Sequence, residues 1–241
     1  MNTVLHKANT RGHVNHEWLD TYHSFSFASY LHPERMNFGV LRVLNDDRVA
    51  EGRGFGTHPH DNMEIISIPL ERDLEHKDNM GNVAVIKEGD VQILSVGTGI
   101  YHCEYNMNQD SEVKFLQIWV FPSKKQVEPR YDQISIREIE KENQFYQILS
   151  PSKGDQGVWI HQNTWFSLGK FSKQTKVNYK LHLSNNGIYA FILEGTANIQ
   201  GQALNIRDGF GIWNTNKIEI QIEIQTESNT KILLLEVPMT I

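Results

Sequence analysis

Two short histidine-bearing segments place the strongest constraint on how this chain can fold. Residues 56–64 carry His58, His60 and Glu64, and residues 97–104 carry His102 and Glu104. In an extended strand, alternate side chains point to the same face. Each segment therefore presents its histidines and carboxylate on one face. If the two strands lie side by side, three imidazoles and at least one carboxylate meet at a single point.

This combination of side chains is a ligand set for a divalent transition metal. Neutral imidazole and carboxylate suit iron, nickel, copper, manganese or zinc. A lone pair of histidines in alternate positions is weak evidence, because such residues are more often exposed on a strand. Two alternating segments, each preceded by glycines, are far more specific, so the sequence predicts one metal site within residues 50–110. By parity alone, either Glu64 or Glu104 can supply the carboxylate.

The composition is that of an ordinary globular protein and narrows the function. The 241 residues are 39% hydrophobic and 22% charged, with a formal net charge of −6 and no basic run that would suit nucleic acid. No apolar stretch approaches the ~20 residues that cross a bilayer, and the first residues lack the apolar core of a signal peptide. The single cysteine excludes an internal disulfide framework. We therefore expect a cytoplasmic protein without direct nucleic-acid or membrane contacts.

Short apolar strands separated by turn residues recur along most of the chain. This spacing is typical of an all-β sandwich or barrel, and the clearest candidate strands in the first half are residues 39–44, 65–70, 83–86, 91–94 and 115–121. Residues 122–150 have mixed charge and no sustained period, and we expect a connection there with one short helix near 137–143. Strand periodicity returns after residue 151, most regularly over 217–224.

The second half of the chain repeats the scaffold of the first half without its histidines. Aligning residues 187–195 with residues 64–72 places Leu181 and Leu183 where the first histidine pair stands. The position of the third histidine then falls among isoleucines. We therefore predict a metal-binding domain, a connecting segment and a second domain that lacks metal ligands, covering residues 1–122, 123–150 and 151–241.

The histidine motifs resemble those of the cupin superfamily. The first motif matches at Gly52, His58, His60 and Glu64, and the end of the second motif matches at Gly99, His102 and Asn106. Three stretches, residues 18–27, 55–60 and 97–104, are more closely similar to pirins, and in particular to the bacterial pirin-like proteins described as quercetin 2,3-dioxygenases. The resemblance covers essentially the whole chain. It implies an all-β fold of two cupin β-barrels, which are double-stranded β-helices of the jelly-roll type, with metal in the N-terminal barrel only.

The resemblance also implies the ligands and the reaction. The metal ligands of pirins correspond to His58, His60, His102 and Glu104, which favours Glu104 over Glu64 as the carboxylate. One divalent transition metal is expected, with iron first and nickel, copper, manganese, cobalt or zinc as alternatives. The expected substrates are a planar flavonol and O2, with Glu104 as the catalytic proton acceptor, opening of the flavonol ring and release of carbon monoxide.

Two alternative functions and two departures from the family pattern accompany this prediction. One alternative is a pirin-like metal-binding regulatory module whose partner is another protein. The other is a cupin isomerase acting on a sugar phosphate, which would need several inward-pointing cations, whereas only Arg53 lies near the motifs. Arg72 stands where the family usually has glycine, and Cys103 lies between two ligands with a parity that points it away from the metal. Phe55, Met63 and Tyr101 are candidate walls for a planar substrate.

Overall fold

The computed structural model describes residues 1–214 and 221–241, and these residues lie mostly in β-strands and the turns between them. Within these two ranges, the only helix is a single 3-10 turn, Ala8–Thr10. No helix in the described part of the chain is long and apolar enough to cross a membrane. The predicted all-β class is confirmed.

The N-terminal half consists of a seven-stranded sheet that faces a four-stranded sheet. The larger sheet has the order β12-β9-β6-β11-β4-β3-β2, and the smaller sheet has the order β5-β10-β7-β8. The strands in chain order are β2 (Gly12–Asn15), β3 (Leu19–His23), β4 (Leu41–Val49), β5 (Gly54–His60), β6 (Glu64–Glu71), β7 (Leu74–Asp78), β8 (Val83–Ile86), β9 (Asp90–Ser95), β10 (Ile100–Asn106), β11 (Val113–Val120) and β12 (Arg130–Ser135).

The C-terminal half repeats this arrangement, with a seven-stranded sheet ordered β1-β20-β17-β22-β15-β13-β14 and a four-stranded sheet ordered β16-β21-β18-β19. Its strands are β1 (Asn2–His6), β13 (Phe145–Ser150), β14 (Val158–Trp159), β15 (Trp165–Phe171), β16 (Lys176–Lys180), β17 (Asn186–Glu194), β18 (Ala197–Ile199), β19 (Gln202–Leu204), β20 (Gly209–Trp213), β21 (Gln221–Thr226) and β22 (Thr230–Pro238).

The strand pairing bears on three predictions about chain organisation. β1 pairs with β20, and β12 pairs with β9, so the N-terminus adds a strand to the second half and the connecting segment adds one to the first. The division at residues 122 and 150 therefore stays a prediction. The predicted helix at 137–143 is wrong, because turn residues stand there instead. The predicted strand at 217–224 lies partly outside the described residues, and β21 begins at Gln221.

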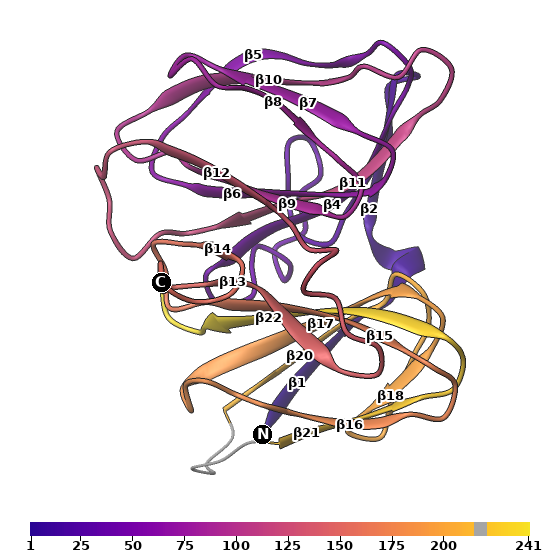
Figure 1. Ribbon diagram of the computed structural model, residues 1–241. Coiled ribbons are helices and arrows are strands. Elements are labelled where there is room, and N and C mark those ends of the chain that lie inside the picture. Colours follow the sequence, from indigo (N-terminus) through magenta and orange to yellow (C-terminus); the bar gives the residue numbers. More distant parts are fainter. Residues whose placement is uncertain (215–220) are drawn as a thin grey trace.

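The two seven-stranded sheets pack face to face in the middle of the molecule, and the four-stranded sheets lie on its outer sides (Figure 1). Alternation along β11 explains this packing, because Leu116 and Ile118 point toward the other half while Phe115 points into its own half. Leu233 and Leu235 of β22 point toward the N-terminal half from the opposite side. The largest buried apolar cluster therefore joins the two halves.

The interiors of the two halves differ in polarity. In the C-terminal half, one continuous apolar cluster that includes Phe171, Ile188 and Leu234 fills the interior. In the N-terminal half, the interior apolar residues form two small clusters, one around Phe115 and the other around Ile100. Buried polar side chains occupy the strand positions between these clusters, namely Ser67, His76, His102, Glu104 and Gln117. Burying polar groups is costly unless they are paired, so these buried polar side chains mark the N-terminal interior as a candidate site.

Candidate metal centre

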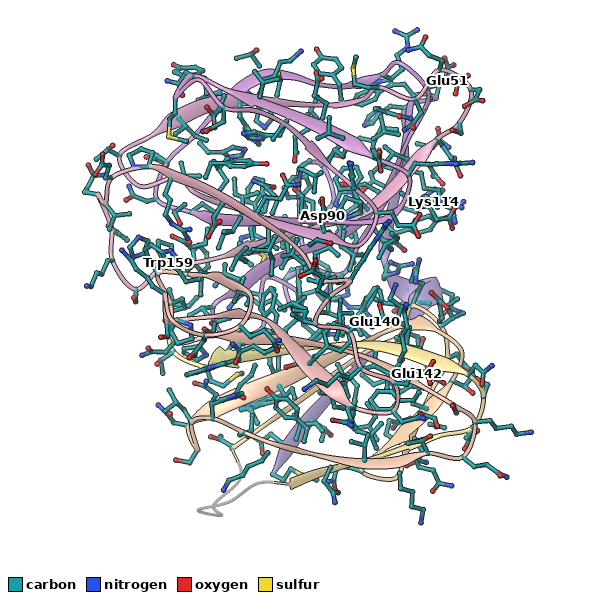
Figure 2. The ribbon with its side chains drawn as sticks, viewed as in Figure 1. Glu51, Asp90, Lys114, Glu140, Glu142 and Trp159 are labelled. Atoms are coloured by element: carbon teal, nitrogen blue, oxygen red, sulfur yellow. The ribbon has the colours of Figure 1, made fainter. Side chains whose placement is uncertain are left out.

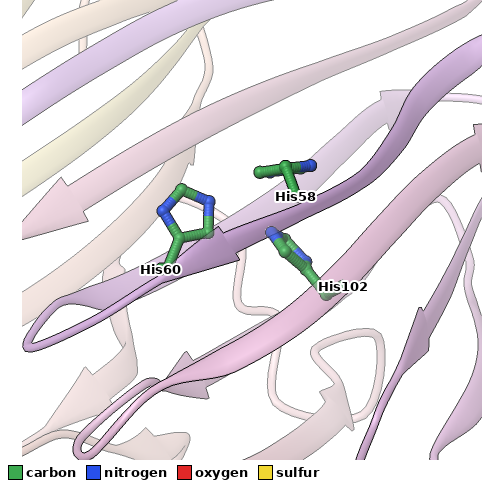
Figure 3. Close-up of side chains that lie close together, drawn as sticks. All are labelled: His58, His60 and His102. Carbon is green, nitrogen blue, oxygen red and sulfur yellow. The ribbon is translucent and has the colours of Figure 1, made fainter.

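Antiparallel pairing of β5 with β10 brings the three predicted histidines together. His58 lies directly opposite His102, and His60 lies opposite Ile100. The ring centroids are 4.8 Å apart for His58 and His60, 4.5 Å for His58 and His102, and 5.0 Å for His60 and His102. Figure 3 shows the three imidazoles gathered beside the two strands. One nitrogen from each ring lies within 4.8 Å of the others, so a single ion can contact all three after small side-chain movements.

The proton positions of these imidazoles suit metal binding. His58 Nδ1 lies 2.8 Å from the Gly56 carbonyl oxygen, which can only accept a hydrogen bond, so Nδ1 carries the proton and Nε2 keeps its lone pair. Both ring nitrogens of His102 are buried and have no hydrogen-bond partner among the residues that the structure describes. Burial, together with neighbouring imidazoles, lowers the pKa of His60 to about 4 and that of His102 to about 3. The buried, neutral and unpartnered nitrogens fit a metal ion.

Glu104 lies on the same inner face of β10, where hydrogen bonds hold its carboxylate. Its Oε1 accepts from Ser67 Oγ at 2.9 Å, and its Oε2 accepts from Gln117 Nε2 at 2.9 Å. Burial raises the pKa of this carboxyl group, which is 1% exposed. In this position Glu104 groups with His76 and His102 rather than with the pair on β5. Glu104 therefore lies beside the three imidazoles. Its carboxylate must give up a hydrogen bond to Ser67 or Gln117 before it can bind the same ion as they do.

Glu64, the other candidate carboxylate, faces the opposite side of its sheet. Ile66 on the same strand and of the same parity belongs to the core between the two halves, whereas Ser67 points inward to Glu104. Glu64 accepts a hydrogen bond from Ser95 Oγ at 2.8 Å, and burial raises its pKa to about 7. Glu64 does not share the face of His58 and His60 that strand alternation predicted, because a turn with Asn62 at φ 46° separates β5 from β6.

The surroundings of Glu64 connect the two halves of the molecule. Arg130 donates from Nη2 to Ser95 Oγ at 3.2 Å and also to the Trp159 carbonyl oxygen. Its guanidinium carbon lies 3.8 Å from the centroid of the Trp159 ring, a cation–π contact. Figure 2 labels Trp159 near the junction of the two halves. Glu64 is therefore a member of a buried interface network.

Two interior residues near the imidazoles were not anticipated. His76 on β7 lies opposite Glu104, and its Nε2 is 3.0 Å from Asp78 Oδ2. In the sequence, the alternation of His76 and Asp78 along a polar strand was a signal that could have identified His76. Only the pairing of β7 with β10 shows that the His76 side chain faces the site. Gln117, the single amide in the apolar run of β11, was a second signal of the same kind.

A cavity of about 240 Å³ opens beside the imidazoles and is lined by His58 and His60. Its apolar and aromatic walls are formed by Val14, Leu19, Phe27, Phe55 and Trp119, and its polar side chains include Thr21, Asn45, Asp47 and Gln117. Of the three residues expected as substrate walls, Phe55 lines this cavity. Met63 and Tyr101 are not among the lining residues, because Met63 packs against the cluster around Ile100 and Tyr101 is 55% exposed on the outer face of β10.

Asp47 in this cavity predicts a pH dependence of stability. Burial raises the pKa of Asp47 to about 7, aided by Asp46 and Glu104 and opposed by the hydrogen bond from Thr21. Between about pH 4 and 7 the folded state therefore binds more protons than the unfolded state, so Asp47 makes stability fall as pH rises. We expect Asp47→Asn to flatten this part of the stability profile, measured by urea unfolding across that pH range. An unchanged slope would contradict the assignment.

Comparison with known proteins agrees with the fold of both halves. The family model described as Pirin matches residues 4–120, and the one described as Quercetinase C-terminal cupin domain matches residues 147–237. A quercetin 2,3-dioxygenase of Escherichia coli is 38% identical over 234 residues, which cover 97% of this chain and 98% of that protein. A pirin-like protein of Caulobacter vibrioides is 34% identical over 226 residues, which cover 93% and 95%.

A solved structure gives the same result in three dimensions. The crystal structure of the bacterial pirin YhhW from Escherichia coli in complex with nickel(II) has a TM-score of 0.91 and 36% sequence identity, covering 98% of this chain and 99% of that one. The similarity thus extends over both halves and includes a relative with a bound divalent metal. The chain belongs to the pirin family and is a bacterial pirin-like bicupin.

Proposed function

We propose that this protein is a metal-dependent dioxygenase of the quercetin 2,3-dioxygenase type, which opens a flavonol ring with O2 and releases carbon monoxide. The observation that carries the proposal is the cavity of about 240 Å³, whose lining combines two imidazoles with aromatic walls. Such a site suits a planar, largely apolar ligand that presents oxygen atoms to a metal. The name of the Escherichia coli relative supports the same chemistry.

The proposed metal ligands are His58, His60, His102 and Glu104, holding one divalent transition metal. Two observations support this set: the buried ring nitrogens of His102 have no hydrogen-bond partner in the described part of the chain, and the tautomer of His58 leaves a lone pair on Nε2. Iron is the expected ion, and nickel, copper, manganese, cobalt and zinc are alternatives; the nickel complex of a related pirin supports a divalent ion. When bound, the ion supplies a Lewis acid that lowers the pKa of a flavonol hydroxyl.

Glu104 is the proposed proton acceptor for that hydroxyl. Burial raises its pKa above the ordinary carboxyl value, which makes it a better base near neutral pH. The donors Ser67 and Gln117 hold its two oxygens in the resting position. Exchanging one of these hydrogen bonds for a contact to the metal or to the substrate hydroxyl would place the base next to the proton that it removes.

The aromatic walls of the cavity are proposed to orient the flavonol and to keep water away from it. Trp119 packs edge-on against His60, with ring centroids 4.9 Å apart, and Phe27 packs edge-on against Trp119 at 5.3 Å. This chain of rings runs from the histidines along the cavity. Offset and edge-to-face contacts of this kind favour a planar aromatic ligand over a flexible polar one.

A metal-binding regulatory module that contacts another protein remains the alternative function. It uses the same metal centre but requires no metal-dependent consumption of O2, so one assay separates the two proposals. We propose a cytoplasmic location for either, because the single cysteine, Cys103, is a free thiol and suits a reducing compartment.

Removal and return of metal test the proposed function. We expect chelator-treated protein to consume no O2 with quercetin, and protein reloaded with Fe²⁺ or Ni²⁺ to regain uptake in proportion to metal content. The measurement is oxygen uptake against metal per chain. Full metal loading with no oxygen uptake for any of the six metals would contradict the dioxygenase and favour the regulatory module.

A further inference from the structure

The interior of the N-terminal half contains two groups of ligand-type side chains that share one histidine. The outer triad consists of His58, His60 and His102, and the inner triad consists of His76, His102 and Glu104. In each triad, one ligand atom from every residue lies within 4.8 Å of the others. Every member of the inner triad is buried, with exposures of 0% for His76, 2% for His102 and 1% for Glu104.

His76 is oriented as metal-binding histidines are. Its Nε2 lies 3.0 Å from Asp78 Oδ2, and the same carboxylate accepts from Asn82 Nδ2 at 2.8 Å and from the Met80 amide at 2.9 Å. A carboxylate surrounded by donors leaves the Nε2 proton on His76 and the lone pair on Nδ1. A histidine that binds metal typically donates its other ring nitrogen to a carboxylate in this way.

The free nitrogen of His76 has no partner within the protein. Nδ1 is buried and makes no hydrogen bond in the described part of the chain. The nearest rings, Tyr131 at 4.8 Å and His102 at 5.4 Å between centroids, provide packing but no proton. A buried acceptor without a donor is costly, and each such case calls for an explanation. A cation between His76, His102 and Glu104 would satisfy this nitrogen together with one ring nitrogen of His102.

We propose that the inner triad is a second binding site for a divalent transition metal. We call this site the inner seat and the outer triad the outer seat, and an ion occupies one or the other. A neutral imidazole has one lone pair, so His102 serves one seat at a time and the chain holds one ion in either position. Of the two triads, only His58 and His60 line the cavity, whereas His76, His102 and Glu104 do not. An ion in the inner seat is therefore withdrawn from substrate. The proposal shares His102 and Glu104 with the proposed metal centre but does not depend on dioxygenase activity.

Metal titration of a variant without the outer pair tests the inner seat. Chelator-treated His58→Ala/His60→Ala protein is titrated with Co²⁺ alone, followed by calorimetry and by the visible absorption of bound cobalt. We expect one Co²⁺ per chain, and loss of that binding when His76→Ala is added. Asp78→Asn in the same background should weaken it by roughly 10–100-fold, the usual effect of removing a carboxylate behind a histidine ligand.

Two outcomes of this titration would overturn the proposal. One is that the double variant binds no Co²⁺, and the other is that adding His76→Ala leaves its binding unchanged. Circular dichroism checks that each variant is folded. If the variants do not fold, anomalous scattering from Co²⁺ soaked into crystals of the unaltered protein decides, with a peak expected inside the inner triad; density only at the outer triad at every soaking concentration contradicts the proposal. These experiments measure metal binding alone. They therefore test the inner seat even if the protein does not catalyse the flavonol reaction.

Discussion

Replacing Glu104 by glutamine is expected to lower quercetin turnover by roughly 10²–10⁴-fold, the range for loss of a positioned general base. Glutamine keeps the size of the side chain and an oxygen that can accept from Ser67 Oγ, but its amide takes no proton from the substrate. Metal content should fall less than turnover, because three imidazoles remain. The measurement is oxygen uptake with quercetin, normalised to metal per chain.

The same substitution at Glu64 is the matched control. Glu64 is equally buried, but it bonds to Ser95 on the far side of the sheet from the imidazoles. Glu64→Gln should therefore change metal content and turnover by no more than a few-fold, while its effect on stability reports the interface with Arg130. If Glu64→Gln removes the metal and Glu104→Gln leaves turnover intact, Glu64 is the carboxylate ligand, as in the general cupin pattern. The assignment of Glu104 is then wrong.

Replacing His102 by alanine is expected to abolish metal binding and turnover together, because His102 belongs to both triads. Replacing His60 removes a member of the outer triad only, so His60→Ala should lose turnover while keeping a fraction of its metal in the inner seat. Neither change should unfold the protein, since the largest apolar cluster, which includes Ile118 and Leu235, contains neither histidine. Metal per chain after loading with Ni²⁺ and far-ultraviolet circular dichroism measure the two effects.

An exposed histidine provides the control for this series. The His13 side chain is 48% exposed, bonds to Asp20 and stacks on Tyr22, outside both triads. His13→Ala should keep full metal content and turnover. Retention of full metal by His102→Ala would contradict both proposed seats at once, whereas equal loss of metal in His60→Ala and His102→Ala would leave only the outer seat.

Local alternation was enough to predict the histidine triad. His58 and His60 are on one strand and His102 is on its direct neighbour, so the side-chain period of two determined which faces meet. The all-β class followed in the same way from short strands with turns between them. These features depend on contacts within strands or between one pair of strands, which sequence patterns describe well.

Features that depend on three-dimensional packing were not predictable in this way. The parity argument for Glu64 failed because a turn at 61–63 moves the chain from the smaller sheet to the larger one. The place of His76 beside Glu104 follows from the pairing of β7 with β10, which no local pattern specifies. The pairing of β1 with β20 is likewise a contact between the two ends of the chain. Periodicity carries no information about such distant pairs.

The fate of both oxygen atoms in a metal-loaded reaction tests the central claim most directly. Protein with a known metal content is given quercetin under ¹⁸O₂, and carbon monoxide is measured in the gas phase while the ring-opened product is analysed by mass spectrometry. If the protein is a metal-dependent dioxygenase, one carbon monoxide is released per flavonol consumed, and both labelled oxygen atoms appear in the ring-opened product. Glu104→Gln should form carbon monoxide and labelled product at a much lower rate. Quercetin loss without carbon monoxide, or equal loss in chelator-treated protein, would contradict it.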